Sequence, residues 1–486
     1  MNFAELQYKY TRRESMKEKD IRIQGCELFY CPILTRVPLK FGPEITTRVI
    51  SARASVTVSG RDGRIAKGLG ETPLSVAWVW PSDIGYEFRL SQLKRFCELL
   101  RDAWRLNDQP GHALEIGHLF IRGRLKQIWE ECNGGVDERL RMPWLAALVC
   151  NSLFDIAVHD AYGIYHGVDT WETYTREYLN HDLSWYYSKE YASKFAGLYP
   201  ADFFVKADDL PTRLKAWHLV GAKDAVTADE LTGGEPQDGY PVLLTDWILR
   251  DGLKCLKIKL TGLDPKWDYD RMVSVGTIAV AEHVDWLSAD FNCTVQDPAY
   301  VCGILDRLLQ EQPRIYAMLL YVEQPFPYDI ERYAIDVRSV SSRKPLFMDE
   351  SAHDWQFVAY GRALGWTGVA LKTCKTMTGA LLTLCWAKSH GMTLMVQDLT
   401  NPMLAQIPHV RLAAYAGTIM GVESNAMQFY PEISRDEARV HPGLFTRRNG
   451  ELNLNTLGKT GMGYRADEIE EARIAAGDAE KWVQAN

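Results

Sequence analysis

This chain of 486 residues lacks the features that mark membrane, secreted or nucleic-acid-binding proteins. No stretch approaches the roughly 18 uncharged apolar residues that a membrane-spanning helix needs. The first 20 residues are charged and contain no apolar segment of the kind found in secretory signals. The formal charge of −8 is spread along the chain without a long basic run. We therefore expect a cytoplasmic protein that has neither a membrane nor a nucleic acid as its partner.

Cysteine spacings typical of metal sites are also missing. The ten cysteines include no C-x-x-C pair and no zinc-type spacing. Cys150, Cys255, Cys374 and Cys385 lie inside apolar runs, where a small buried thiol is expected. The cysteine pattern therefore favours a reducing compartment.

Length and composition indicate more than one folding unit. A chain of this length exceeds one ordinary core, so two domains or a decorated barrel are expected. Its hydrophobic content of 47% and charged content of 24% are typical of a globular protein. Residues 170–215 interrupt the pattern, because they are crowded with Tyr, Trp and Phe interspersed with charge. We interpret them as an insertion that covers a pocket or packs against another subunit.

The N-terminal third combines predicted strands with predicted helices. Residues 21–72 alternate between apolar and polar side chains, and a polar turn at 60–63 predicts a hairpin. Gly68 and Gly70 lack the strand–GxGxxG–helix context of a phosphate loop, so we assign them to turns. Residues 142–165 have the 3.6-residue apolar period of a helix, with a proline near its start. His159 and Asp160 on that helix are expected to form capping or interhelical hydrogen bonds.

The second half of the chain contains six hydrophobic runs that each end in a functional side chain. Steps between these ends are roughly 23 to 33 residues, about one strand–helix unit of a (β/α)₈ barrel. The carboxyl ends of all strands in such a barrel open onto the face that holds the active site. The runs and their ends are LKIK (Lys257, Lys259), LSADFN (Asp290), LLYVEQP (Glu323), PLFMDES (Asp349), GVALK (Lys372) and TLMVQD (Gln397, Asp398).

The residue types at these ends predict a particular chemistry. Three carboxylates on adjacent strands form an all-oxygen site, which suits Mg²⁺ best. Lysines precede and follow the carboxylates, so ammonium groups reach the same mouth from opposite walls. This combination is what removal of a proton α to a carboxylate requires, because the metal stabilises the enediolate that forms. We expect a neighbouring ammonium and the metal to lower the pKa of the base lysine.

At these residues the chain resembles the enolase superfamily and, within it, the muconate lactonizing enzyme subgroup. The segments VPLKFGPEITTRV and VSGRDGRIAKGLGETP resemble the capping domain, and SLFDIAVHDAYGIYHG resembles the helix that leads into the barrel. The segment RNGELNLNTLGKTGMGY resembles the tail that returns to the capping domain. The resemblance implies an α/β fold, a modified TIM (β/α) barrel with an N-terminal α+β capping domain that the C-terminal tail completes. We expect a capping domain over 1–165, the insertion over 166–215, the barrel over 216–432 and the tail over 433–486.

The resemblance also implies roles for the residues at the strand ends. Lys259 would be the base, Lys257 would assist it, and Lys372 would be the opposing acid or base. The metal ligands would be Asp290, Glu323 and Asp349, with Glu350 as an alternative third ligand. The absence of a histidine in TLMVQD argues against the mandelate racemase pattern.

Substrate specificity in this family depends on two capping-domain loops and the last barrel strands. Trp78, Trp80 and Phe41 would wall the pocket or pack the domain interface. The candidate substrate-binding residues are Phe41, Trp78, Asn292, Gln397, Asp398, Asn401 and Gln428. Two departures leave the substrate open: KTMTGA lacks the Gly-Gly pair common after the sixth-strand lysine, and VESNAMQFYPE lacks the Asp-x-Asp of dipeptide epimerases.

We therefore expect a Mg²⁺-dependent isomerase or lyase that acts on a small-molecule carboxylate. Proton abstraction would lead to racemisation or epimerisation, or to cycloisomerisation. The alternatives are an acid-sugar dehydratase and a barrel that binds metal without turnover. Barrels of this kind often form homo-oligomers, so we expect one here.

Overall fold

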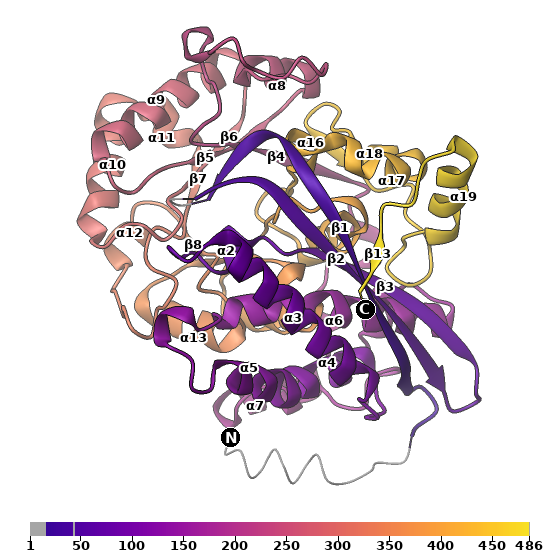
Figure 1. Cartoon of the computed structure of the whole chain (residues 1–486). Helices are drawn as coiled ribbons and strands as arrows, with labels where there is room; N and C mark the ends of the chain where they lie inside the picture. Colours follow the sequence, from indigo (N-terminus) through magenta and orange to yellow (C-terminus); the bar gives the residue numbers. More distant parts are fainter. Residues whose placement is uncertain (1–15, 42–43, 486) are drawn as a thin grey trace.

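The computed structural model describes residues 16–41 and 44–485. An N-terminal body of strands and helices lies against a larger barrel, and the C-terminal segment returns to the N-terminal body (Figure 1). Each body has a hydrophobic core built mostly from its own residues, and a smaller cluster joins cap residues such as Ile33 to barrel residues such as Leu219. The N-terminal α+β cap, its C-terminal strand and the barrel predicted from the sequence are confirmed.

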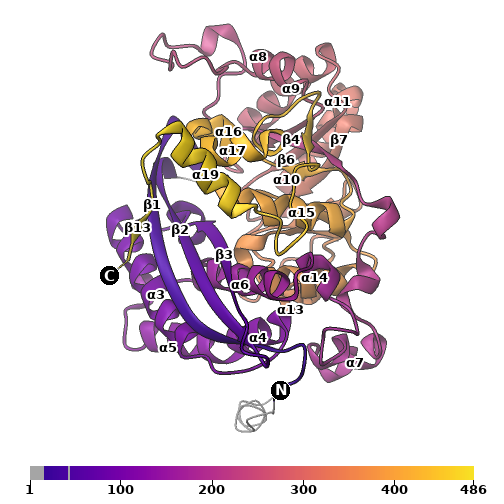
Figure 2. The ribbon, with the colours of Figure 1, turned by 90° about the vertical axis from the view of Figure 1, so that its right-hand side faces the viewer.

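The cap contains a four-stranded antiparallel sheet in the order β13-β1-β2-β3. Its strands are β1 (Ile21–Phe41), β2 (Glu44–Gly60), β3 (Ile65–Pro73) and β13 (Val483–Gln484). The predicted hairpin is present, with the turn between Gly60 and Ile65. Strand β13 pairs with β1 at Phe29 and Tyr30, so the tail supplies an edge strand of the cap (Figure 2).

Five helices complete the cap: α2 (Val76–Val79), α3 (Tyr86–Arg105), α4 (Ala113–Phe120), α5 (Lys126–Asn133) and α6 (Trp144–His166). Helix α6 lies on β2 and β3, and Gly68 and Gly70 lie where β3 meets its backbone. A Cβ at Gly70 would overlap the backbone of Leu153 and Ala157. The assignment of these glycines to turns was wrong, because their role is to permit this close strand–helix approach.

Helix α6 is the predicted core helix, and it begins after Pro143. Within the described residues it is the one helix long and apolar enough to cross a membrane, but 89% of that window is buried inside the protein. The ring of His159 contacts the Thr378 hydroxyl (3.0 Å) and the Tyr174 hydroxyl (2.8 Å). Asp160 accepts hydrogen bonds from the backbone N–H groups of Leu69 and Met462. The predicted interhelical hydrogen bond is confirmed for His159, whereas Asp160 binds strand β3 and the C-terminal tail instead of capping a helix or joining two helices.

The aromatic-rich segment packs against the helices of its own barrel. It contains short helices at Thr170–Thr173, Leu183–Trp185, Lys189–Phe195 (α7), Pro200–Phe203 and Ala207–Asp209. Trp171 stacks on Tyr415 of α15 (Gln406–Ala416), with ring centroids 4.3 Å apart. The Tyr187 hydroxyl donates to the carbonyl of Leu382 in α14 (Met377–Ser389) at 2.8 Å. Its polar-tipped aromatics therefore fasten the segment to the outer helices of the barrel.

The barrel consists of parallel strands in chain order from β4 to β10, with β11 next to β4. Strands β10 and β11 face each other and nearly close the ring. The strands are β4 (Arg213–Val220), β5 (Cys255–Lys259), β6 (Trp286–Asp290), β7 (Leu319–Glu323), β8 (Leu346–Met348), β9 (Gly368–Leu371), β10 (Thr393–Val396) and β11 (Val422–Glu423). All six runs singled out in the sequence form strands of this barrel.

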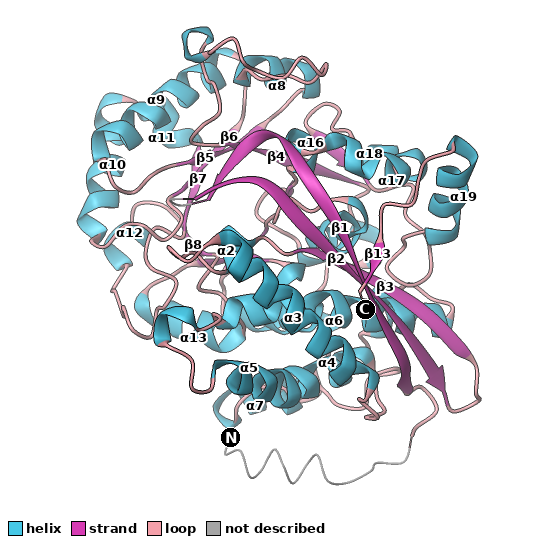
Figure 3. Ribbon diagram, viewed as in Figure 1, coloured by secondary structure: helices cyan, strands magenta, loops and turns pink. Residues whose placement is uncertain are grey.

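Helices surround the strands on the outside (Figure 3). They include α8 (Leu244–Asp251), α9 (Pro265–Ala281), α10 (Pro298–Glu311), α11 (Pro313–Met318), α12 (Arg338–Ser341), α13 (Trp355–Leu364), α14 and α15. The C-terminal part adds α16 (Ala426–Phe429), α17 (Arg435–Val440), α18 (Pro442–Phe445), β12 (Glu451–Asn453) and α19 (Ala466–Ala476). Inside the barrel, a buried layer of Trp217, Cys255, Tyr321, Phe347 and Met395 forms a floor. Side chains two residues further along the strands face the mouth above this floor.

Candidate functional site

The barrel mouth gathers charged side chains from the ends of successive strands. Lys257 and Lys259 both face inward from β5, because alternate residues of a strand point to the same side. Asp290 ends β6 and is paired across the sheet with Lys259 and with Glu323, which ends β7. Asp349 directly follows β8 and Lys372 directly follows β9. All six side chains are buried.

Lys257 lies at the centre of one group of carboxylates. Its Nζ is 2.7 Å from Glu323 Oε1 and 3.1 Å from both Asp290 Oδ2 and Glu423 Oε2. Lys259 forms an ion pair with the same Asp290 oxygen. One ammonium group thus holds three carboxylates from β6, β7 and β11 around a single point.

Asp349 is the centre of a second group. Its Oδ2 lies 3.2 Å from Lys372 Nζ, and its Oδ1 lies 3.3 Å from Lys375 Nζ. Lys372 also donates to the backbone carbonyl of Asp398 at 2.7 Å. The β5 lysines and the lysines that follow β9 therefore approach the mouth from opposite walls.

The site contains more carboxyl groups than ammonium groups. Six buried carboxyls, Asp290, Glu323, Asp349, Glu350, Asp398 and Glu423, face four buried lysines, Lys257, Lys259, Lys372 and Lys375. With all ten groups ionised, the carboxyls exceed the ammonium groups by two charges, which is the charge of one divalent cation. Buried charge without compensation is costly, so this excess suits a bound cation.

The donor chemistry of the mouth fits Mg²⁺. The expected ligands Asp290, Glu323 and Asp349 offer only oxygen atoms, which this ion prefers. Within residues 16–41 and 44–485, no three His, Cys, Asp or Glu side chains already stand close enough to share a metal. The reason is that Lys257 lies among the carboxylates of β6 and β7, while Lys372 and Lys375 hold Asp349. Binding of Mg²⁺ would therefore require these lysines to release the carboxylates.

The pKa values follow from these pairings. Burial opposes the charge on Lys257, but Glu323, Glu423 and Asp290 outweigh it and raise its pKa well above the usual value. Burial likewise opposes the charge on Lys372, and Asp349 outweighs it, so the pKa of Lys372 is raised. The nearest charges of these two lysines are carboxylates. The lowering of the pKa of the base lysine that we expect with a metal ion present stays a prediction. A divalent cation that binds those carboxylates would reverse this balance.

Burial opposes ionisation of these carboxyl groups, and the neighbouring charges decide the net direction of each pKa shift. Burial raises the pKa of Glu323, and the neighbouring charge of Asp290 raises it further. Burial also opposes ionisation of Asp290, but Lys259 and Lys257 lower its pKa below the usual value. Asp398, buried next to Glu423, has its pKa raised to about 7. Raised carboxyl pKa values are what an excess of buried negative charge produces.

Two residues of the cluster were missed in the sequence. Glu423 lies 25 residues after Asp398, which continues the barrel spacing, but the strand that it ends is only two residues long. Lys375 follows Lys372 by three residues, within a single turn of 3₁₀ helix (Thr373–Lys375) that brings both ammonium groups to Asp349. The spacing signal could have identified Glu423, whereas Lys375 required knowledge of the turn.

Three of the expected substrate-binding residues lie at the cluster. The indole N–H of Trp78, on cap helix α2, donates to Glu350 Oε1 at 3.1 Å, and the Trp78 ring lies 5.1 Å from Lys372 Nζ. The side-chain amide of Asn292 donates to the same Glu350 oxygen at 3.3 Å. Gln397 donates to Glu323 and to the Tyr321 hydroxyl.

The remaining candidates use their side chains in structural contacts, lie away from the cluster or fall outside the described part. Asp398 uses its carboxylate to accept from the backbone N–H groups of Asn401 and Asn425. Gln428 binds both backbone polar groups of Leu219. Trp80 is buried in the core of the cap. The side chain of Phe41 lies outside the described residues.

A cavity of about 390 Å³ leads to the cluster. Its wall includes Trp78, Asn292, Tyr328, Tyr333 and Glu350, so it lies between the cap helix α2 and the loops after β6, β7 and β8. The cavity is large enough for a small organic acid and reaches the carboxylate next to Asp349.

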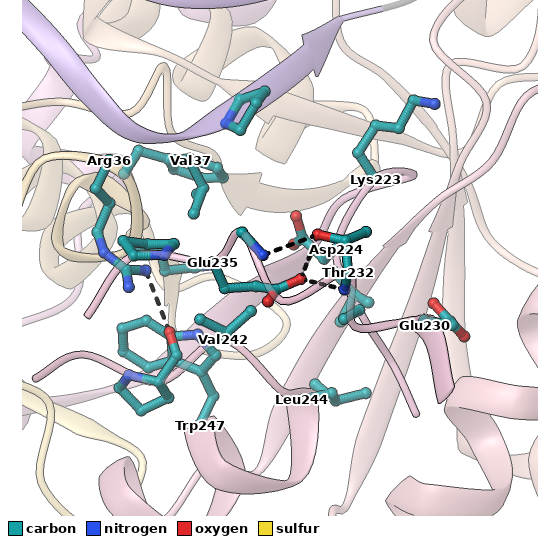
Figure 4. Close-up of a pocket in the computed structure, with 18 of the residues that line it drawn as sticks. Arg36, Val37, Lys223, Asp224, Glu230, Thr232, Glu235, Val242, Leu244 and Trp247 are labelled. Carbon is teal, nitrogen blue, oxygen red and sulfur yellow. Dashed lines mark hydrogen bonds between the residues drawn. The ribbon is translucent and has the colours of Figure 1, made fainter. Parts of the chain in front are cut away.

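A second cavity of about 300 Å³ lies on the outer side of β4 (Figure 4). Leu219 faces the barrel interior beside Lys257, so its neighbours His218 and Val220 face outward into this cavity. Val37 of the cap and Trp247 of α8 form further parts of its wall, and Gln428 borders it. Strand β4 lies between this cavity and the lysine–carboxylate cluster. Gln428 therefore borders the outer cavity and not the barrel mouth, where the other candidate substrate-binding residues were expected.

Comparisons with known proteins agree with this architecture. Residues 242–470 match the family described as Enolase C-terminal domain-like. No curated protein matches the chain. Solved structures of low sequence identity match nearly its whole length.

One such structure is a mandelate racemase/muconate lactonizing protein from Herpetosiphon aurantiacus, 18% identical, covering 91% of this chain and 97% of that one, with a TM-score of 0.57. Another is an enolase from Mycobacterium smegmatis complexed with tartrate, 15% identical, covering 96% of each chain, with a TM-score of 0.59. A third is a dipeptide epimerase from Enterococcus faecalis complexed with Mg and the dipeptide L-Leu-L-Tyr, 13% identical, covering 91% and 99%, with a TM-score of 0.57. At these identities the likeness establishes the fold alone.

The family match covers the strand-end carboxylates and lysines that were identified from the sequence. It also supports the resemblance on which their roles were inferred. Residues 242–470 therefore form a mandelate racemase/muconate lactonizing enzyme-type C-terminal domain of the enolase superfamily.

Proposed function

We propose that this protein is a Mg²⁺-dependent enzyme that removes the α-proton of a small carboxylate substrate. The observation that carries the proposal is the placement of lysines on opposite walls of one barrel mouth, with carboxylates between them. A structural ion-pair network has no need for four buried lysines at one barrel mouth, since each costs desolvation energy. A proton-transfer site requires such groups on both faces of the substrate.

Each residue has a separate role in the proposed reaction. Asp290, Glu323 and Asp349 would hold the metal ion. When bound, Mg²⁺ supplies positive charge that stabilises the negative charge developing on the substrate carboxylate. Lys259 removes the α-proton, Lys257 orients the carboxylate, and Lys372 faces the substrate from the opposite wall. Glu423 keeps Lys257 charged and in place.

Opposed lysines favour an isomerisation. A proton removed by Lys259 and a proton delivered by Lys372 would invert the α-carbon, which gives racemisation or epimerisation. Cycloisomerisation uses the same enediolate with a different second step. We also propose a cytoplasmic location, because the ten cysteines are all free and eight are buried, and we propose a homo-oligomer on the basis of the resemblance to this family.

The test is proton exchange followed by NMR in D₂O. The purified protein is incubated with MgCl₂ and a panel of acid sugars, dipeptides, amino acids and N-acyl amino acids. We expect the α-proton signal of at least one class to disappear, and we expect Lys259→Ala and Lys372→Ala to slow this loss by orders of magnitude. Lys266→Ala is the matched control, because Lys266 has a side chain 82% exposed on α9.

Two results would reject the proposal. One is exchange that Lys259→Ala and Lys372→Ala leave unchanged. The other is Mg²⁺ binding, measured by calorimetry, without exchange on any member of the panel. The second result would favour a barrel that binds metal without turnover.

A further inference from the structure

Glu350 is a buried carboxyl group with one oxygen still available. Its side chain follows the expected ligand Asp349 and is 5% exposed. Oε1 accepts from Trp78 and Asn292, whereas Oε2 has no hydrogen-bond partner within residues 16–41 and 44–485. The thiol of Cys293 is its other close polar neighbour, and a thiol is a weak donor. Leaving a buried carboxylate oxygen without a hydrogen bond costs free energy. Oε2 can therefore accept a hydrogen bond from a donor group on a bound ligand.

Glu350 borders the cavity of about 390 Å³ described above. The wall beside it is aromatic, because Trp78, Tyr328 and Tyr333 all line the same space. Trp78 already has two ammonium groups near its ring, those of Lys372 at 5.1 Å and Lys375 at 5.7 Å. Aromatic faces combined with a carboxylate form a suitable environment for a cation that also donates hydrogen bonds.

The charged residues at the rim of the cavity add no net charge to it. Asp329 and Arg332 both line it and both are exposed, and they have opposite charges. Glu350 is therefore the carboxyl group in the buried part of the wall. Burial and the neighbouring charges of Asp349 and Asp290 raise its pKa, and a cation beside it would favour the ionised form.

We propose that the substrate carries a protonated amine, and that Glu350 Oε2 accepts a hydrogen bond from it. This inference rests on the proposed function, because it assigns a substrate class to the same site. The amine lies near the reacting carbon, since the Trp78 indole is in contact with Lys372 on one side and with Glu350 on the other. Free amino acids and dipeptides with a free N-terminus fit this requirement, whereas acid sugars and N-acyl amino acids do not.

Glu350 has one competing role, that of third metal ligand in place of Asp349. The two roles predict different results for Glu350→Gln. A metal ligand would lose Mg²⁺ affinity in this variant, whereas an amine acceptor would retain Mg²⁺ affinity and lose only its preference for cationic substrates.

The experiment compares amino acids and dipeptides with their N-acetyl derivatives, which have the same skeleton without the positive charge. We measure α-proton exchange by NMR and binding by calorimetry, in the wild type, in Glu350→Gln and in Glu331→Gln. The third protein is the control, because Glu331 is exposed and outside the cavity wall. Calorimetry with MgCl₂ alone is carried out on all three.

We expect kcat/KM for exchange to be at least about tenfold higher for the amines than for their N-acetyl derivatives, as a charge-assisted hydrogen bond implies. Glu350→Gln should remove that preference and leave Mg²⁺ affinity within about twofold, while Glu331→Gln should retain the preference. Exchange on acid sugars or N-acyl amino acids, with none on amines, would overturn the inference and leave the proposed function intact. Loss of Mg²⁺ binding in Glu350→Gln would also overturn it.

If no member exchanges in the wild type, the proposed function fails and calorimetry decides the inference separately. Binding of amines at least tenfold tighter than binding of the N-acetyl derivatives, lost in Glu350→Gln, would support it. Equal binding of the two sets, or no binding, would overturn it.

Discussion

Lys257→Met tests the central arrangement of the site, because it removes the ammonium group from among three carboxylates. Asp290, Glu323 and Glu423 lie 3.1, 2.7 and 3.1 Å from Lys257 Nζ, and the lysine side chain is 3% exposed. Breaking a buried ion pair by removing one partner costs about 3–5 kcal/mol, because the remaining charges stay buried without compensation. Met has a similar length and is apolar, so the packing of the stem is preserved.

The assay is urea unfolding in EDTA and in MgCl₂, with free energies taken from the transition midpoints and slopes. In EDTA we expect Lys257→Met to lower the free energy of unfolding by about 3–5 kcal/mol. In MgCl₂ we expect the variant to recover more of its stability than the wild type gains, because the carboxylates are then free to bind the cation.

The control is Lys266→Met, which breaks an exposed i,i+4 ion pair on α9 and should change stability by about 0.5 kcal/mol or less. A loss below about 1 kcal/mol for Lys257→Met in EDTA would show that Lys257 is not buried among these carboxylates in solution. Equal effects of MgCl₂ on variant and wild type would show that the same carboxylates do not bind the metal.

Three further predictions concern packing and pH, each followed by urea unfolding. Gly70→Ala should cost about 1–3 kcal/mol or more, because the new methyl group overlaps the backbone of α6, whereas Gly303→Ala in α10, with open space around it, should be neutral or stabilising. Trp171→Ala should cost about 3–5 kcal/mol, since the ring is 2% exposed and stacked on the barrel; a loss below about 1 kcal/mol would mean that the aromatic-rich segment is not docked. Burial raises the pKa of Glu71 from 4.5 to about 7, although Arg53 opposes this, so the folded state binds the proton more tightly and wild-type stability falls as pH rises between these values. The stability of Glu71→Gln relative to wild type should therefore increase by about 2–3 kcal/mol from pH 4 to pH 8, and a difference independent of pH would contradict the assigned burial.

The sequence was sufficient to predict the strands that build the mouth. Each of these strands is an apolar run that ends in a charged or amide side chain, and such an ending is easy to recognise. Asp290 and Glu323 are paired across neighbouring strands, as a parallel barrel with this spacing requires. The spacing between strand ends depends on the length of a strand–helix unit, which is a local property of the chain.

Other features depended on contacts between distant segments. Gly70 packs against the backbone of α6, which lies more than 80 residues later in the chain. No local sequence pattern could therefore distinguish Gly70 from a glycine in a turn. Glu423 is the last residue of a strand of only two residues, which is too short to be recognised from the sequence. The raised pKa values of Lys257 and Lys372 could not be predicted either, because they depend on which charges lie nearest to each lysine. Those partners are carboxylates from other strands.

The pairing of β13 with β1 has a consequence for the order of events during synthesis. Tyr30 emerges from the ribosome hundreds of residues before its partner Val483. During that time the outer edge of β1 has unsatisfied backbone groups, which invite pairing with other chains. Contacts of such long sequence separation also form slowly, because the intervening chain must be ordered first. The nascent protein therefore passes through a stage in which its barrel is translated while its cap still has an open edge, and that stage is where chaperones would have the most effect on yield.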